Sequence, residues 1–181
     1  MKKLLKHRFG VTITEVMVIV VILGILVAST SFILRRVGRH FRLTGAATQF
    51  KQDCTLARQM ALEKNKTFLV RCFPDSTPQF WQIFRVDSAG FFSTDNRWRY
   101  ELHRLIYFGV GSDVSGSTGP DGNPIPSDGV SFPANALALM PRRGAPQPGV
   151  VYLTDGTETR AVLVNSMGSA TVMQYKNGSW Q

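Results

Sequence analysis

The stretch Lys2–Arg36 reads KKLLKHRFGVTITEVMVIVVILGILVASTSFILRR and carries the strongest structural signal in the chain. A basic leader ends at Gly10, a single acid follows at Glu15, and the nineteen residues Val16–Leu34 then carry no charge. At the rise of an α-helix, a run of this length reaches about 28 Å, close to the thickness of a bilayer's hydrocarbon core. The stretch therefore predicts a helical membrane anchor with one acidic residue at its start.

The net charge of the chain belongs mainly to the flanks of this anchor. The formal net charge is +9, and seven basic residues lie between Lys2 and Arg39. From Phe41 onward, 14 Lys and Arg residues stand against 11 Asp and Glu, so the rest of the chain is nearly balanced. Because positive residues beside an anchor tend to stay in the cytoplasm, the leader predicts a cytoplasmic N-terminus and an exported C-terminal domain.

Three interpretations of the apolar stretch are open. In the first, it is a cleaved secretory signal, and the small residues at Val27-Ala28-Ser29 form the peptidase site. In the second, it is an uncleaved anchor and Glu15 lies at the membrane interface. In the third, it is an anchor that is processed at Gly10. Only the third accounts together for the glycine, for the glutamate five residues later, and for the length of the apolar run.

The segment GVTITEVMVIVVILGILVA, residues 10–28, resembles the signal of type IV prepilins and type II secretion pseudopilins. The resemblance implies that a prepilin peptidase cuts after Gly10 and that the new amine of Val11 is N-methylated. The family usually has Phe or Met at that position. Glu15 becomes the fifth residue of the processed chain. An ionised carboxylate in hydrocarbon costs a few kcal/mol, so we expect Glu15 to pair with the N-terminal amine of a neighbouring subunit during assembly.

Helical periodicity continues beyond the anchor to about Asn65, and a β-rich region follows. The pattern predicts a leader peptide over 1–10, a transmembrane helix over 11–34 and an amphipathic helix over 35–66. Short runs rich in β-branched and aromatic residues then predict an antiparallel β domain over 67–181. The expected fold class is α+β and pilin-like, with a long N-terminal helix packed on an antiparallel sheet. The expected strands cover residues 67–73, 79–86, 98–108, 150–154, 159–164 and 170–175.

The C-terminal third carries a second resemblance. The runs FPANALALMPRRG, GVVYLTDG and TRAVLVNSMGSATV, within residues 132–172, are similar to the end of the GspH/FimT family domain. Members of that family are minor pseudopilins of type II secretion or minor pilins of type IV pili. The resemblance implies a structural subunit without enzymatic activity or cofactor. Its implied partners are other pilin or pseudopilin subunits, the prepilin peptidase, an inner-membrane assembly platform and the lipid of the inner membrane, from which the subunit is extracted into a filament.

Two cysteines and one long loop leave further possibilities. Cys54 and Cys72 fall on the helix and the first strand, where an exported domain permits a disulfide; two buried thiols are the other possibility.

The loop 109–129 is rich in Gly, Ser, Pro and Asp, and oxygen ligands suit calcium. Its spacing does not fit a calcium-loop template, so we predict ordinary turns and no metal. The residues concerned are Asp113, Asp121, Asn123 and Asp128.

The sequence contains no recognisable catalytic set, since its three histidines are scattered and no phosphate-binding glycine loop is present. The alternative function is a DNA-binding minor pilin acting in natural DNA uptake, because arginines beside aromatic residues could hold nucleic acid. The DNA-binding members of the family have a basic G-R-x-R motif in the terminal hairpin, whereas residues 168–171 read GSAT here. DNA binding is therefore the less favoured function. Its candidate contacts are Arg97, Arg99, Arg104, Arg142 and Arg143.

Overall fold

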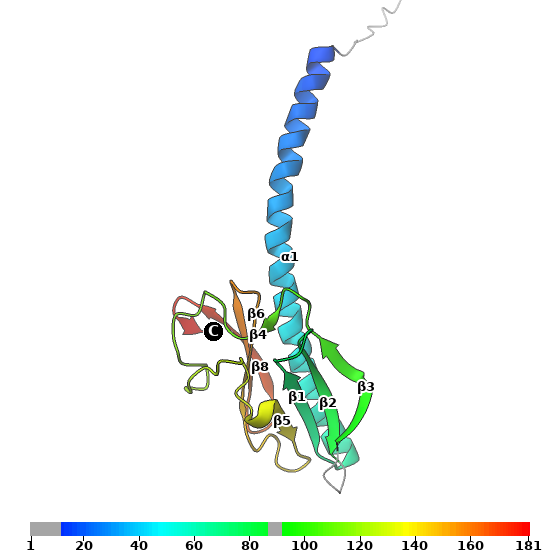
Figure 1. The fold of residues 1–181 in the computed structure, drawn as a ribbon, viewed down its shortest axis with the longest axis vertical. Coiled ribbons are helices and arrows are strands. Elements are labelled where there is room, and N and C mark those ends of the chain that lie inside the picture. The colour runs from blue at the N-terminus through cyan, green and yellow to red at the C-terminus, as the bar shows by residue number, and fades with distance from the viewer. Residues whose placement is uncertain (1–11, 87–91) are drawn as a thin grey trace, which may run out of the picture. The chain divides into compact units, whose positions relative to one another are not determined.

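The structure, a computed structural model, describes residues 12–86 and 92–181, with the side chains of 29–36 and 92–97 excluded. One long helix, α1 (Ile13–Lys64), precedes a series of short strands (Figure 1). The chain divides into two compact units, Met1–Gly38 and Arg39–Gln181, which we treat separately. The helix confirms the prediction of a single helical element that ends near Asn65.

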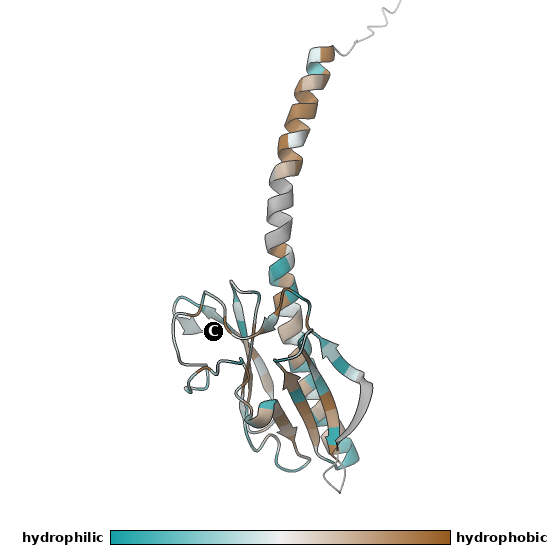
Figure 2. Cartoon of the chain, viewed as in Figure 1, coloured by the Kyte–Doolittle hydropathy of each residue, from teal (hydrophilic) through white to brown (hydrophobic). Residues whose placement is uncertain are grey.

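The first unit contains the beginning of α1, and this part of the helix is strongly apolar (Figure 2). Every side chain from Thr12 to Ala28 is exposed. Among the residues described, no helix contains an apolar stretch long enough to cross a membrane. The predicted transmembrane segment, 11–34, lies partly outside the described residues and stays a prediction.

The second unit contains two antiparallel sheets that share a core with the later part of α1. The first sheet has the strand order β3-β2-β1-β5. Its central pair is in register from Phe68 opposite Arg85 to Phe73 opposite Phe80. The four strands are β1 (Phe68–Phe73), β2 (Phe80–Val86), β3 (Phe92–Glu101) and β5 (Ala136–Leu139), and β5 follows a short 3-10 turn, η1 (Pro133–Asn135).

The second sheet has the order β4-β6-β7-β8-β9 and is built mainly from the C-terminal hairpins. A short loop that contains Asp155-Gly156 joins β6 to β7 between the paired residues Thr154 and Thr159, so the hairpin expected at this position is present. The sheet includes residues that are buried on both faces, because a long loop covers the side away from α1. The strands are β4 (Tyr107–Phe108), β6 (Gly149–Thr154), β7 (Thr159–Val164), β8 (Ala170–Lys176) and β9 (Ser179–Trp180).

The main core lies between α1 and the two sheets. Along α1 the buried residues recur at helical spacing, and along β1 they alternate, as expected where each element buries one face. Phe50 from the helix meets the fully buried Trp81 from β2 edge to face, with ring centroids 5.1 Å apart. The buried helical residues are Leu43, Ala46, Ala47, Phe50, Cys54, Ala57, Met60 and Ala61.

The loop 109–129 forms a second, smaller core on the outer face of the β6–β7–β8 sheet. Ile125 from the loop and Trp180 from β9 pack against Val150 and Tyr152 of β6. The approach is close: a Cβ atom at Gly119 would lie 1.9 Å from the Tyr152 hydroxyl, so only glycine fits there. The loop is therefore a packed cover of the sheet.

The fold class is confirmed, but several details of the strand prediction are wrong. The strand expected from residue 98 begins at Phe92, and β5 and β9 are not among the expected strands. The β region forms two sheets instead of one. The run expected as a single strand over 98–108 is broken after Glu101, because the chain turns where the Ile106 amide donates to the His103 carbonyl at 2.7 Å. The chain then enters the second sheet as β4. Leu102 and Ile106 are both buried, so the apolar pattern continues across the break and hides it in the sequence.

Candidate functional site

The first turn of α1 places Glu15 next to a side-chain cap. The Thr12 hydroxyl oxygen accepts a hydrogen bond from the Glu15 amide at 3.3 Å, and the Thr12 carbonyl accepts one from Val16 at 3.2 Å. A threonine followed three residues later by glutamate is the pattern of a capping box, of which the threonine half is formed here. Sequence reasoning identified Glu15 and missed Thr12, although this spacing was visible in the sequence.

Glu15 begins an exposed apolar surface. The exposed fraction is 81% at Ile13 and 64% at Met17, and the exposed series continues to Val27. The Glu15 carboxylate forms no ion pair or hydrogen bond with another residue that the structure describes. Gly10 and Val11, the expected cleavage and methylation positions, lie outside the described residues.

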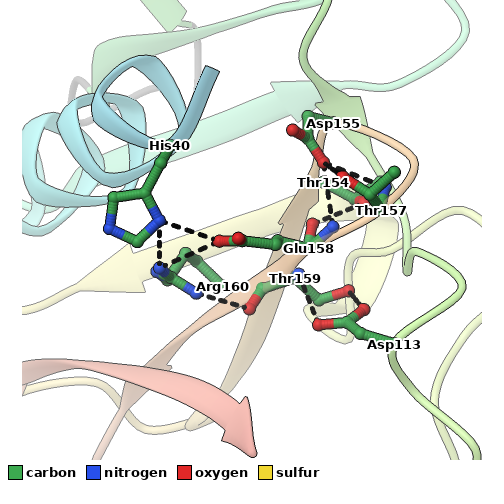
Figure 3. Close-up of polar contacts among 8 residues, drawn as sticks. All are labelled: His40, Asp113, Thr154, Asp155, Thr157, Glu158, Thr159 and Arg160. Atoms are coloured by element: carbon green, nitrogen blue, oxygen red, sulfur yellow. Dashed lines mark hydrogen bonds and ion pairs between the residues drawn. The ribbon is translucent and has the colours of Figure 1, made fainter. Parts of the chain in front are cut away.

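A polar cluster connects α1 to the β6–β7 hairpin within the second unit (Figure 3). The Nδ1 atom of His40 lies 2.9 Å from a carboxylate oxygen of Glu158, and the Arg160 guanidinium lies 3.4 Å from that same oxygen. Arg160 is 4% exposed and also donates to the Thr159 carbonyl. Because a buried guanidinium needs a counter-charge, Glu158 stabilises Arg160 while it holds the helix to the hairpin.

The turn that carries Glu158 is itself held by Asp155 (Figure 3). One Asp155 carboxylate oxygen accepts hydrogen bonds from the Glu158 and Thr157 amides, both at 2.9 Å, and from the Thr157 hydroxyl at 2.7 Å. Partial burial alone would raise the pKa of Asp155, but these hydrogen bonds and the charge of Arg39 lower it below its ordinary value. The cluster is therefore a structural clamp around the hairpin.

The four possible calcium ligands of the loop 109–129 serve as turn residues. Asp113 accepts hydrogen bonds from the Thr159 amide and hydroxyl at 2.8 and 2.6 Å and so pins the loop to β7. Asp121 bonds Asn123, and Asp128 accepts from the Val130 amide. Within the part of the chain that is described, no group of three or more His, Cys, Asp or Glu side chains could hold a metal ion.

Cys54 and Cys72 are free thiols in the structure, and both are buried in the main core. Burial raises the pKa of each thiol. Negative charge on Cys72 raises the pKa of Cys54 further, and the charge of Asp128 raises the pKa of Cys72 further. This is the arrangement of two packed thiols. A disulfide in the exported protein stays a prediction.

The candidate DNA-contacting arginines whose side chains are described do not lie together on one β-strand. Arg99 on β3 pairs with Glu101 at 2.8 Å, and its guanidinium lies 3.7 Å from the centre of the Phe80 ring. Arg142 and Arg143 are exposed in the loop after β5, the strand at the opposite edge of that sheet. Arg104 is exposed beyond the end of β3, and the side chain of Arg97 lies outside the described residues.

The chain is α+β, and its long N-terminal helix is exposed and apolar at its start and packs on antiparallel sheets later. This is the fold of a pseudopilin-like subunit. The chain belongs to the GspH family: residues 46–168 match the family of the type II transport protein GspH. It is a minor pseudopilin of type II secretion, and the family is structural, not enzymatic.

Two solved structures are similar, both of the minor pseudopilin EpsH from the type 2 secretion system of Vibrio cholerae. The first is 12% identical with a TM-score of 0.49, over 76% of this chain and 99% of that chain. The second is 14% identical with a TM-score of 0.48, over 72% and 92%. No curated protein has a significant sequence match to the chain.

Proposed function

We propose that the start of α1 anchors this minor pseudopilin in the inner membrane and later carries it into the pseudopilus. The supporting observation is that every side chain from Thr12 to Ala28 is exposed although most of them, including all those from Val16 to Leu23, are apolar. An exposed apolar surface of this kind is typical of segments that contact lipid or another protein. The basic leader predicts a cytoplasmic N-terminus and a periplasmic C-terminal unit.

In this proposal Glu15 aligns each new subunit with its neighbour. A carboxylate is favoured in the first turn of a helix, where the helix dipole is positive, but it is costly once the segment lies in hydrocarbon. Cleavage after Gly10 would create an amine at Val11, and methylation leaves that amine cationic. The amine of an adjacent subunit can then neutralise Glu15. Because an unpaired charge in the membrane is strongly unfavourable, only the correct axial register would be stable.

Replacing Glu15 tests this role. We expect Glu15→Ala and Glu15→Gln to be processed normally but to co-purify with the other pseudopilins at a reduced level, since both remove the charge and the second keeps the shape. Glu63→Ala is the matched control, because Glu63 is an exposed acid near the other end of α1. Normal incorporation of Glu15→Gln would show that the charge is not what aligns the subunits.

Processing is tested separately from assembly. We expect the mature protein to begin at Val11 with a methylated amine, and Gly10→Ala to accumulate as the unprocessed chain. N-terminal sequencing and intact-mass measurement read out both expectations. A mature chain that begins near Thr30 would instead establish an ordinary secretory signal and remove the basis for the Glu15 pairing.

The alternative of a DNA-binding minor pilin is less favoured, because Arg99 is engaged by Glu101 and by the Phe80 ring. We expect no mobility shift of duplex DNA by the detergent-solubilised chain at moderate salt. A shift that Arg142→Gln and Arg143→Gln together abolish would revive this function.

A further inference from the structure

The outward side of the first sheet carries half-buried aromatic residues where polar ones are usual, and Gln82, a polar residue of β2 on this side, is itself buried. Along β1, Phe68, Val70 and Cys72 point into the core, so the alternate residues face outward. The register places Phe73 opposite Phe80, and Leu69 opposite Phe84. An antiparallel sheet with one solvated face normally presents polar side chains there. We call this surface, formed by Leu69, Arg71, Phe73, Phe80, Phe84, Arg99, Ala134 and Ala136, the outer β1–β2 face.

Two arginines and two rings form a column across this face. The Phe73 and Phe80 rings stack with centroids 4.4 Å apart and an interplanar angle of 16°. The Arg99 guanidinium lies 3.7 Å from the Phe80 centroid, and that of Arg71 lies 5.2 Å from the Phe73 centroid. Since a second ring and a guanidinium cannot stack on the same side, both sides of the Phe80 ring are occupied. The column is therefore pre-arranged, with positive charge at each end.

Beside the column lies an apolar hollow of about 130 Å³, lined by Leu69, Arg71, Phe84, Ala134 and Ala136. An apolar cavity of about 150 Å³ is large enough to hold benzene, so the hollow fits one aliphatic side chain. At its rim, Ala134 has a φ of +50°, a conformation that alanine adopts rarely and that is found at binding sites.

The two arginines of the column differ in their pairing. Arg99 is paired with Glu101, whereas exposed Arg71 forms no ion pair with any residue that the structure describes. Arg71 also lines the hollow, so its charge lies next to the apolar space. A ligand that fills the hollow would therefore gain from a carboxylate placed one residue away from its apolar group.

We propose that the outer β1–β2 face is a docking site for a segment of a partner protein in which an aliphatic side chain is adjacent to an Asp or Glu. The aliphatic side chain fills the hollow and the carboxylate pairs with Arg71. Single-stranded nucleic acid is the less suitable occupant, because base stacking needs an open ring face and Phe80 has none. This site is separate from α1, so it does not depend on the role proposed for Glu15.

Short capped peptides test the site on the full chain in detergent. The probe is Ac-Gly-Leu-Asp-Gly-NH₂, and the matched peptides replace Leu by Ser or Asp by Asn. Saturation-transfer NMR suits weak binding and gives each dissociation constant by titration. We expect the Leu-Asp peptide to bind about two- to fivefold more tightly than the Leu-Asn peptide, the range for an exposed ion pair, and the Ser-Asp peptide to bind no more than background.

Two variants localise the binding. Ala136→Phe fills the hollow from the edge strand and should abolish binding of the Leu-Asp peptide. Arg71→Gln should remove the preference for Asp over Asn, while Arg85→Gln, an equally exposed arginine at the end of β2, should keep it. Equal binding of the three peptides to the parent would overturn the proposal, as would an unchanged Asp preference in Arg71→Gln. A thymidine dodecamer that binds the parent and loses its binding in Ala136→Phe would assign the face to nucleic acid instead.

Discussion

Replacing Asp53 should distinguish a buried hydrogen bond from a buried charge in the core of the second unit. One Asp53 carboxylate oxygen accepts from the indole N–H of Trp81 at 2.6 Å, and the other accepts from the side-chain amide of Gln49 at 2.9 Å. Trp81 is fully buried and stacks on Tyr100 with ring centroids 4.4 Å apart. The indole N–H of this buried ring therefore loses its acceptor if the carboxylate is removed.

The magnitude follows from the group that is left without a partner. A buried donor that loses its acceptor costs about 1–3 kcal/mol, so we expect Asp53→Ala to lower the free energy of unfolding by about this amount. Asp53→Asn keeps an oxygen for the indole and should cost less than Asp53→Ala. Gln49→Ala is the matched control, because it removes the other hydrogen bond of Asp53 without leaving a donor buried, and should cost about 1 kcal/mol or less.

The pH dependence gives an independent check. Burial raises the pKa of Asp53, and the hydrogen bonds from Trp81 and Gln49 only partly offset this. Since the folded state then holds the proton more tightly than the unfolded chain, this contribution to stability is present at acid pH and is lost as the pH rises through the raised pKa. The stability advantage of the parent over Asp53→Asn should therefore shrink between acid and neutral pH.

Urea unfolding of the full chain in detergent, followed by tryptophan fluorescence, measures all three variants. Equal stability of Asp53→Ala and Asp53→Asn would refute the reasoning, because it would mean that the indole N–H is satisfied without Asp53. If Gln49→Ala lowered the free energy of unfolding as much as Asp53→Ala, the reasoning would also be refuted. The lost stability would then not come from the unpaired indole N–H of Trp81.

Three further predictions concern the rest of the second unit. Gly129→Ala should destabilise the chain by about 2–5 kcal/mol, because φ is +73° and the new Cβ would lie 2.2 Å from a backbone nitrogen. Gly122→Ala is the control: its φ of +79° imposes the same backbone strain, but open space around it removes the steric cost, so it should destabilise the chain less. Cys54 and Cys72 should resist alkylation until the chain is unfolded, and failure to alkylate even then, reversed by a reductant, would reveal a disulfide. The lowered pKa of Asp155 means that its carboxylate stabilises the fold at pH values above the ordinary pKa of an aspartate, and that this stabilisation is lost as the pH falls. In urea unfolding, Asp155→Asn should therefore be less stable than the parent at neutral pH and equally stable only at acid pH.

The long helix and most strands were predictable because their signals are local. Buried residues from Leu43 to Ala61 recur on one helical face, and that periodicity can be read directly from the sequence. The hairpin at Asp155-Gly156 was predictable for the same reason, since its turn residues stand between two β-branched runs. The short β5 (Ala136–Leu139) was harder, because two of its four residues are alanine and alanine is depleted in strands.

The contacts that could not be predicted join residues far apart in the chain. Arg160 looks like an exposed strand residue in the sequence, yet it is buried because Glu158 and His40, the latter 120 residues away, lie against it. The outer β1–β2 face was hidden for a related reason. Whether Phe73 and Phe80 face the core or the solvent depends on a pairing register that single-strand patterns do not fix.

The distribution of exposed apolar side chains separates two tasks within one helix. From Leu43 onward α1 buries most of its apolar residues against the rest of the second unit, with Leu62 as an exposed exception, whereas from Thr12 to Ala28 it leaves them exposed. A core mutation such as Asp53→Ala should therefore change the stability of the second unit and leave processing at Gly10 unaffected. A substitution at Glu15 should have the opposite effect, with normal stability and impaired assembly. If the two kinds of substitution produced the same defect, the separation of anchor and globular unit argued from exposure would be wrong.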